Sequence, residues 1–474
     1  MSLNTKKKTS IAIISVVVVL LVISVGVTYT EVFSKNNSAT TSAVVGRSGQ
    51  FSANSFSSQF VTEYNLPNGL PNAIAVDSYG RVWTVLQNSS SLGVFDPANG
   101  SVRAIPIPGL KPPLTSWGIA IDNSRRLVWF TEEISNSIWS YNTQDGVFKE
   151  YAIPTPQANP YQVALDQTGN AWFSEFSGDR IGVVAANGTL LEFQIPITSS
   201  NPTGITVDPK TNRVWFNLLD TSGATDEFYV GSFYQGSFTF NDITPLVDTP
   251  VGIAIDSYGN LWLTQHGASL VSEFNPVTHY FRTISTSIPP DGASYPYFVY
   301  VDNSSGNIWF NEHYGNAIAV FDPKLNTLVE YEIPSRNTND GNISGALTMT
   351  LSPTGVPWFT ELYTGKIGFI NSSSVLGTSL NVSTDKITLE NESTSVIHLS
   401  IAGSTNETTY LSATVGNFTG NFLFNFTQYS GEGKYSTDLS VQNGGSPPGV
   451  YFATISVESK NVIVSRIIEI QCIG

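Results

Sequence analysis

The stretch that decides the fold runs from residue 163 to residue 175: Val163-Ala164-Leu165-Asp166, then Gln167-Thr168-Gly169-Asn170, then Ala171-Trp172-Phe173-Ser174-Glu175. An alternating apolar segment ends in Asp, a short turn with Gly follows, and a second apolar segment carries Trp. Two such segments around a turn predict antiparallel β-strands. Two further short segments, at residues 180–183 and 191–196, complete a unit of four strands.

The same unit recurs along most of the chain. Its tryptophan is found at spacings of 46, 43, 43, 47, 47 and 49 residues, at Trp83, Trp129, Trp172, Trp215, Trp262, Trp309 and Trp358. Four short strands per repeat of this length are typical of a propeller blade. A helical solenoid would show apolar residues every 3.6 positions, which this repeat does not have. We therefore predict an all-β protein whose main body is a seven-bladed β-propeller.

The last unit lacks its fourth strand. After Trp358 a third segment runs from Lys366 to Ile370, and no segment ending in Ile-Pro or Leu-Pro follows it. A segment of that type stands instead before the first unit, from Phe60 to Pro67. We predict that it forms the outer strand of the last blade, because this pairing closes the ring and removes two free sheet edges.

The N-terminal region predicts export and membrane attachment. Lys6-Lys7-Lys8 precedes an apolar run from Ile11 to Val27, which as a helix would span about 25 Å. A retained anchor fits this length, and a cleaved signal peptide is the alternative. The lysines place the short end in the cytoplasm and the rest of the chain outside. We expect a single-pass cell-membrane protein, with the anchor or signal in residues 1–30 and a flexible Ser-, Asn- and Thr-rich spacer in residues 31–58.

The Trp repeat gives the propeller the range 59–374, and a different pattern occupies residues 375–474. Alternating stretches such as Val396 to Ile401 and Val450 to Val457, separated by Gly and Pro turns, predict an immunoglobulin-like β-sandwich. Six Asn-x-Ser/Thr sites cluster between residues 371 and 425 and are glycosylation candidates: Asn371, Asn381, Asn391, Asn406, Asn417 and Asn425.

Composition excludes several classes of function. The formal net charge of −15 argues against a nucleic-acid partner, because phosphate binding requires clustered Lys and Arg. The single cysteine, Cys472, excludes an intrachain disulfide framework and a cysteine-rich metal site.

Taken together, the motifs of the repeat resemble a known family. The pattern Pro-x-x-Ile, Asp-x-x-Gly-Asn-x-Trp-Phe, Ile-Gly and a Glu-containing strand ending in Ile-Pro is similar to that of virginiamycin B lyase (streptogramin lyase). Residues 160–196 match it almost throughout. The resemblance covers the propeller and neither the anchor nor the sandwich. It implies an enzyme that opens a cyclic depsipeptide by elimination across its ester, using Mg²⁺ and a His base at one mouth of the ring.

The family's site residues transfer poorly to this chain. Its two essential histidines follow the proline that opens a blade, and those positions are Asn72, Trp117, Tyr161, Thr203, Val251, Tyr297 and Leu347 here. Its catalytic Glu lies four residues beyond a repeat Trp, which corresponds to Gln87, Glu133, Phe176, Leu219, His266, His313 and Leu362. Glu133 matches in type, whereas no histidine stands at a blade-opening position.

Blade geometry nevertheless predicts a site at this mouth. The inner strand begins, and the antiparallel Trp strand ends, at the same end of the central channel. We expect that end to gather Glu132, Glu133, Glu175, Gln265, His266, Glu312, His313 and Glu361 beside Trp117, Tyr161 and Tyr297. Such groups could hold a divalent cation or support proton transfer, with His266, His313 and Glu133 as catalytic candidates. The alternatives are that the glutamates belong to the fold and that the histidines are solvated rim residues.

The Asp that ends most inner strands invites a comparison with calcium ligands. Asp side chains at such turns more often bond to their own backbone, and we expect the Asp of this repeat to cap the turn.

Two hypotheses about function follow. The first is a cell-surface binding or scaffold protein that recognises a small molecule, peptide or glycan at the propeller mouth, with no certain cofactor. The second is a lyase-like carbon–oxygen lyase that depends on a divalent cation such as Mg²⁺ and acts on an exported substrate.

Overall fold

A computed structural model describes residues 50–473 except 53–54, 67–68, 221–225, 245, 287–292, 374–375, 404–407, 416–417, 431–432 and 460. The predicted anchor in residues 1–30 lies outside the described residues, as does most of the predicted spacer. In the part that is described, no helix is long and apolar enough to cross a membrane.

The described chain is almost entirely β-structure, with one short 3₁₀ turn, η1 (His266–Ala268). Most strands form consecutive antiparallel groups of four, which we call blades. Their strands are β4 (Pro71–Val76), β5 (Val82–Leu86), β6 (Ser91–Asp96) and β7 (Ser101–Pro106); β8 (Ile119–Asp122), β9 (Leu127–Glu132), β10 (Ser137–Asn142) and β11 (Phe148–Ala152); β12 (Pro160–Leu165), β13 (Ala171–Glu175), β14 (Arg180–Val184) and β15 (Leu190–Gln194); β16 (Ser200–Val207), β17 (Val214–Asp220), β18 (Glu227–Tyr234) and β19 (Ser237–Asp242); β20 (Pro250–Ile255), β21 (Leu261–Gln265), β22 (Leu270–Phe274) and β23 (Phe281–Ser285); β24 (Pro296–Asp302), β25 (Asn307–Glu312), β26 (Ala317–Asp322) and β27 (Thr327–Glu332).

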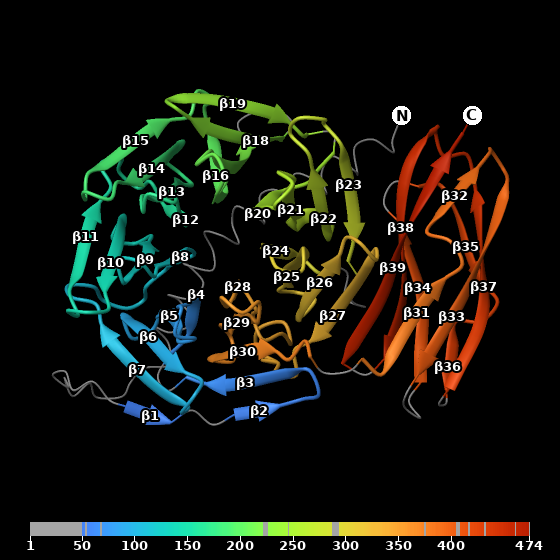
Figure 1. The fold of residues 1–474 in the computed structure, drawn as a ribbon, viewed down its shortest axis with the longest axis horizontal. Coiled ribbons are helices and arrows are strands. Elements are labelled where there is room, and N and C mark those ends of the chain that lie inside the picture. Colours follow the sequence, from blue (N-terminus) through green and yellow to red (C-terminus); the bar gives the residue numbers. More distant parts are fainter. Residues whose placement is uncertain are drawn as a thin grey trace. The chain divides into compact units, whose positions relative to one another are not determined.

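The blades form a ring (Figure 1), and we call the cavity along their inner strands the central channel. Each inner strand contacts the inner strand of the next blade, from β4 through β8, β12, β16, β20 and β24 to β28 (Met349–Leu351), and β28 contacts β4 again. The predicted all-β, propeller-like architecture is therefore confirmed.

The last blade closes the ring in the way the sequence predicts. Strands β28, β29 (Pro357–Glu361) and β30 (Lys366–Ile370) are consecutive, and the outer strand is β3 (Val61–Asn65) from the other end of the described chain. The register runs from Val61 opposite Ile370 to Asn65 opposite Lys366. Two short strands, β1 (Gln50–Ser52) and β2 (Ser55–Ser57), add to β7 and β3.

The repeated Asp caps its turn and also anchors the repeat Trp. In the β12–β15 blade, Asp166 Oδ1 accepts the backbone N–H groups of Thr168 and Asn170, and its Oδ2 accepts the indole N–H of Trp172 at 3.0 Å. Two other blades repeat the bond to indole, at 2.9 Å from Trp83 to Asp77 and at 3.2 Å from Trp262 to Asp256. The turn-capping hypothesis is confirmed for these carboxylates.

Residues beyond the propeller form two further sheets. One continues the β24–β27 blade, because β39 (Val462–Cys472) pairs with β27. It then adds β38 (Gly449–Ser459), β34 (Thr408–Val415) and β36 (Gln428–Ser430), with β32 (Lys386–Leu389) parallel to β39. The other sheet holds β31 (Thr378–Val382), β33 (Thr394–Gly403), β37 (Gly433–Asn443) and β35 (Gly420–Phe424). Buried aliphatic side chains alternate with exposed residues along the middle of β33, and buried residues alternate with half-buried ones along β37.

Candidate functional site

The register of the blades brings the predicted site positions to one end of the channel. Pro160, Pro250 and Pro296, which begin their inner strands, pair with Glu175, Gln265 and Glu312 at the ends of the second strands. The residue that follows each blade-opening proline and the residue that follows the end of each second strand therefore lie close together at one end of the channel.

Three aromatic residues and two histidines meet there, which we call the aromatic–imidazole cluster: Trp117, Tyr161, Tyr297, His266 and His313. The Trp117 ring lies 5.7 Å from Tyr161 and 6.0 Å from Tyr297, between ring centroids. The Tyr161 hydroxyl donates to the Tyr297 hydroxyl. Tyr297 presents its ring to both imidazoles, at 5.4 Å and 5.5 Å. All five side chains are buried, so the cluster fills this end of the channel.

The two histidines stack on each other, as expected from their equivalent positions in neighbouring blades. Their ring centroids are 5.1 Å apart and the planes differ by 16°. Burial lowers the pKa of His266 well below its ordinary value, and the neighbouring His313 lowers it further. Burial also lowers the pKa of His313 to about 4, against the opposing effect of the Tyr295 carbonyl. Both rings are therefore neutral at neutral pH.

Hydrogen bonding differs between the two rings. His313 Nδ1 lies 3.0 Å from the Tyr295 carbonyl oxygen, so a neutral ring donates from Nδ1 and keeps Nε2 as an acceptor. His266 Nδ1 is buried without a hydrogen-bond partner among the described residues. Tyr295, which the sequence analysis did not select, stacks on His266 at 4.8 Å.

Glu133 lies beside this cluster and accepts the indole N–H of Trp117 at 3.4 Å. Burial raises the pKa of Glu133 to about 7, and the charge of Glu132 raises it further, whereas hydrogen bonds from Trp117 and Asn159 lower it. Its carboxyl group is thus poised to exchange a proton near neutral pH, which the two imidazoles are not.

The residues three positions beyond each repeat Trp differ from the prediction. The side chains of Glu132, Glu175, Gln265, Glu312 and Glu361 are fully buried inside their own blades and do not line the channel mouth. Alternation along a strand explains this placement, since the residue at Trp+3 faces the same side as the buried apolar residue at Trp+1.

The partners of these side chains are local. Glu132 accepts the backbone N–H groups of Thr115, Ile134 and Ser135, and Gln265 accepts the N–H of Asp248 at 3.2 Å. The fold-based alternative for the glutamates is therefore the one that fits.

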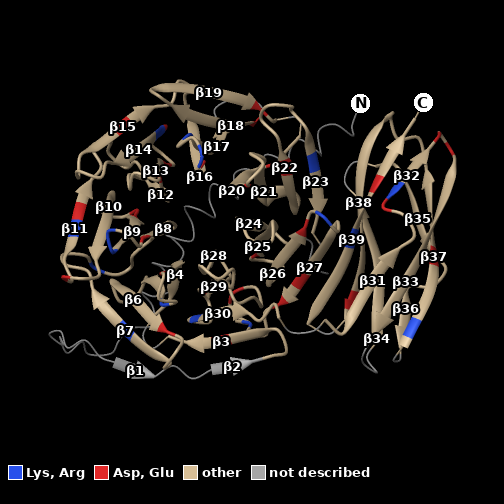
Figure 2. Cartoon of the chain, viewed as in Figure 1, with Lys and Arg blue, Asp and Glu red and all other residues tan. Residues whose placement is uncertain are grey.

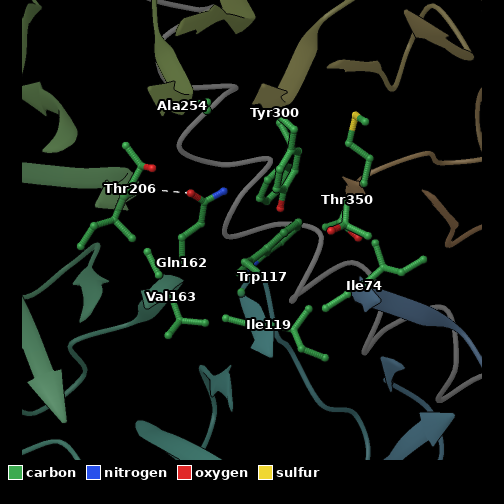
Figure 3. A pocket seen from close by; sticks show the side chains of 18 of the residues that line it. Ile74, Trp117, Ile119, Gln162, Val163, Thr206, Ala254, Tyr300 and Thr350 are labelled. Atoms are coloured by element: carbon green, nitrogen blue, oxygen red, sulfur yellow. Dashed lines mark hydrogen bonds between the residues drawn. The ribbon is translucent and has the colours of Figure 1, made fainter. Parts of the chain in front are cut away.

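A cavity of about 290 Å³ lies along the inner strands (Figure 3). Trp117 belongs to both the cluster and the cavity wall. The lining comes from all the inner strands and is mostly apolar, with no charged side chain; its polar members are Asn123, Gln162, Thr206, Tyr300, Thr348 and Thr350. Gln162 Oε1 accepts the N–H of Ile205 at 3.2 Å. Sequence reasoning missed these residues because it followed only the end at which the inner strands begin.

The residues that the structure describes at the channel end do not form a site for a divalent cation. Throughout the described part of the chain, no three His, Cys, Asp or Glu side chains are grouped so that they could hold a metal ion. Mg²⁺ requires near-octahedral oxygen ligands, whereas the cluster offers two imidazoles and aromatic rings. These residues do not fit a Mg²⁺ site.

The fold and site are those of a β-propeller with a packed aromatic channel end. The Virginiamycin B lyase family model matches residues 45–224. A curated virginiamycin B lyase from Nocardia farcinica is 27% identical over 177 residues, 37% of this chain and 56% of that protein. The match therefore spans about half the length of the curated relative.

Solved structures extend the similarity to the whole ring. A streptogramin B lyase has 26% identity and a TM-score of 0.56, covering 66% of this chain and 97% of its own. Virginiamycin B lyase from Staphylococcus aureus, at 24% identity, has the same TM-score and covers 65% and 98%. The resemblance of the propeller to virginiamycin B lyases is confirmed.

Proposed function

We propose that this protein is an exported, membrane-anchored binding or scaffold protein whose propeller recognises an uncharged small molecule, peptide or glycan segment in the central channel. The ring acts as a closed seven-bladed propeller, and the C-terminal sheets form an immunoglobulin-like sandwich that extends it. Export and anchoring rest on the N-terminal Lys-rich and apolar pattern and on the rules for orientation of such segments.

One observation carries the binding proposal. The blade-opening positions that hold essential histidines in the resembling lyases are here occupied by packed residues, among them Trp117, Tyr161 and Tyr297. Next to this packed end lies a cavity without charged lining. Aromatic faces, hydroxyls and an amide around an uncharged cavity recognise neutral ligands by stacking and hydrogen bonding.

Glycosylation is part of the same proposal. The described candidates Asn371, Asn381, Asn391 and Asn425 are exposed, as glycan attachment requires, while Asn406 and Asn417 lie outside the described residues.

The proposed binding is tested with the full chain and a panel of neutral oligosaccharides and uncharged peptides, by calorimetric titration. Gln162→Leu and Thr206→Val, which change the cavity wall without touching the cluster, should each weaken binding of any ligand found by about 10-fold, the value of one lost hydrogen bond to a neutral group. Leu191→Ala on the exposed face of β15 is the control. Ligands that bind equally to both cavity variants would place recognition elsewhere.

A lyase-like enzyme is the second candidate, and Glu133 favours it. A carboxyl group with a pKa of about 7 suits general-base catalysis at neutral pH, and loss of such a base slows a reaction by roughly 10²- to 10⁴-fold. On the binding proposal we expect no opening of streptogramin B antibiotics, with or without Mg²⁺. Turnover that Glu133→Gln, His266→Ala or His313→Ala abolishes would establish the enzyme instead.

A further inference from the structure

Three blades place a buried glutamate of the second strand beside a glutamate of the fourth strand, which is buried in two of them and half-buried at Glu192. In each, the Glu at the end of the second strand faces a Glu on the fourth strand: Glu175 with Glu192, Glu312 with Glu330, and Glu361 with Glu63. The exposed fractions of Glu175, Glu312 and Glu361 are 0%, 1% and 0%. The proposed ligand-binding role uses none of these residues.

Strand register explains why the two carboxyl groups meet. The fourth-strand Glu stands opposite a small residue of the third strand, which is Gly182 opposite Glu192 and Gly368 opposite Glu63; in the third blade it is Ala319 opposite Glu330. The rings of Phe173 and Phe359 fill the space above Gly182 and Gly368, and Glu175 and Glu361 lie two residues further along the same second strands. Because residues two apart on a strand and residues paired across strands share a face, the second- and fourth-strand glutamates project from the same face of each blade.

The donors around each pair are unevenly distributed. In two of the pairs the fourth-strand member accepts an N–H group from the preceding blade, as Thr155 donates to Glu192 at 3.1 Å and Ser335 to Glu63 at 3.1 Å. By contrast, neither carboxyl oxygen of Glu175 has a hydrogen-bond donor among the described residues, and Oε1 of Glu312 and of Glu361 has none.

Two carboxylates that meet inside a blade disfavour each other's charge, since desolvation and mutual repulsion act in the same direction. In the Glu361–Glu63 pair, Lys366 Nζ lies 3.2 Å from Glu63 Oε2 and compensates the charge of that member. We propose that each of these three pairs is a proton-binding site, in which one proton shared by two glutamates ties the second strand of a blade to its fourth strand. In the Glu175–Glu192 and Glu361–Glu63 pairs the proton resides on the second-strand member, because the N–H donors stabilise negative charge on its partner.

Electrostatics of the surroundings agree with this assignment. Burial raises the pKa of Glu175 to about 8, and Glu192 raises it further, against the nearby charge of Arg180. Burial, and then the facing glutamate, raises the pKa of Glu312 and of Glu361 well above the ordinary value. For Glu361, Thr364 and Lys366 oppose the shift.

The raised pKa values determine how the stability of the folded chain depends on pH. A carboxyl group whose pKa is raised on folding stabilises the folded chain fully below the unfolded value of 4.5, and this contribution is lost as pH rises through the folded value. For Glu175 the loss extends from about pH 4.5 to about pH 8. The ring is therefore held most firmly in mildly acidic solution and loosens in alkali.

The neighbouring β8–β11 blade provides a matched control. Its Glu132 occupies the same position as Glu175 but accepts three backbone N–H groups, and Ser137 Oγ donates to the fourth-strand Glu150 at 2.8 Å. The fourth-strand Glu150 is exposed and stands opposite Trp139 instead of a small residue.

The experiment measures thermal unfolding of the full chain from pH 4 to pH 9. Glu175→Gln, Glu312→Gln and Glu361→Gln replace the shared proton by an amide N–H that does not titrate. Each should raise the melting temperature at pH 8, by about 2 °C, and flatten its fall with pH. Glu132→Gln should lower the melting temperature at pH 8, because it replaces a carboxylate that accepts three backbone N–H groups.

A second measurement does not require the variants to fold. At pH 7, unfolding of the wild-type chain should release about three protons that belong to the pairs, detected by calorimetry in buffers of different ionisation enthalpy. The carbonyl stretch of protonated carboxyl groups should persist in infrared spectra at pH 7 and vanish in alkali. Absence of both signals would overturn the proposal, as would a melting temperature at pH 8 that calcium raises and a chelator lowers, because a cation would then occupy the pairs.

Discussion

Two blades of the ring take a strand from a distant part of the chain, and they use it differently. The closing blade receives β3, and the β24–β27 blade receives β39. Both additions are antiparallel and each aligns five residue pairs. The first strand completes a blade of three strands, whereas the second adds to a blade that already has four. The pairing of β3 should therefore stabilise the propeller more than the pairing of β39, because loss of β3 leaves an incomplete blade and loss of β39 leaves a complete one.

Side-chain packing reinforces this contrast. Phe60, Val61 and Leu66, in and around β3, are buried, and the Tyr64 ring lies 4.6 Å from Phe95 of the first blade. β3 thus joins the last blade to the first. From the C-terminal sheets, Ile467 is buried in the core of the β24–β27 blade.

Deletion of residues 60–66 should have the largest effect. Losing several fully buried apolar side chains costs about 1.5–3 kcal/mol each, and the ring loses its closure, so the loss is comparable with the entire stability of a typical domain. We expect no cooperative thermal transition of the propeller in near-ultraviolet circular dichroism. Deletion of residues 31–49, which removes none of the described strands, is the control. A β3 deletion that melts like the full chain would refute the closure argument.

Truncation after residue 373 should have a smaller effect. The propeller retains all its four-stranded blades but exposes β27 as an edge and loses the packing of Ile467. We expect a folded propeller with a melting temperature lowered by several degrees, consistent with about 2–4 kcal/mol, and increased self-association through the new edge. Analytical ultracentrifugation and calorimetry measure the two effects. Complete unfolding would show that the fifth strand matters as much as the fourth.

Single hydrogen bonds at the two junctions should give the smallest effects. Ser335 Oγ donates to the Glu63 carboxylate at 2.8 Å in the closing blade, and Thr454 Oγ1 of β38 donates to the Ser285 carbonyl at 2.9 Å. A bond to a charged group contributes about 1.5–3 kcal/mol and a neutral bond about 1 kcal/mol. Ser335→Ala should therefore destabilise more than Thr454→Val in denaturant titrations, and the reverse order would contradict the comparison.

Much of this fold is local in the sequence, and that part could be predicted. The Asp and Trp of one unit stand six residues apart and bond within one hairpin, as between Asp166 and Trp172. Closure by β3 was predictable because the fourth-strand motif is missing at one end of the repeat and present at the other. The meeting of His266 and His313 followed from their equivalent places in adjacent units.

Other features depend on register across three strands, which a single sequence does not reveal. The direction of Glu175 and its approach to Glu192 require both the alternation along β13 and the alignment of β13, β14 and β15. Likewise, nothing in the pattern of residues 375–474 indicates that β39 pairs with a propeller blade. The uncharged residues of the channel wall come from all the inner strands, so no short sequence motif marks them.

Charged residues make up only 12% of the chain and are distributed over the whole fold. Figure 2 shows the Lys and Arg residues scattered over separate strands, with Asp and Glu interspersed. With a net charge of −15, carboxyl groups that can be neutralised by protons inside the blades reduce the self-repulsion of the folded chain.

The closure of the ring also dictates an order of events during synthesis. Val61 pairs with Ile370, about 300 residues later in the chain. At about 5–20 residues per second, β3 leaves the ribosome roughly 15 seconds to a minute before its partner exists. During that interval β3, whose apolar side chains are buried in the folded ring, has no partner strand while the six preceding blades form. Ring closure is therefore the last folding step and the step most prone to misassembly.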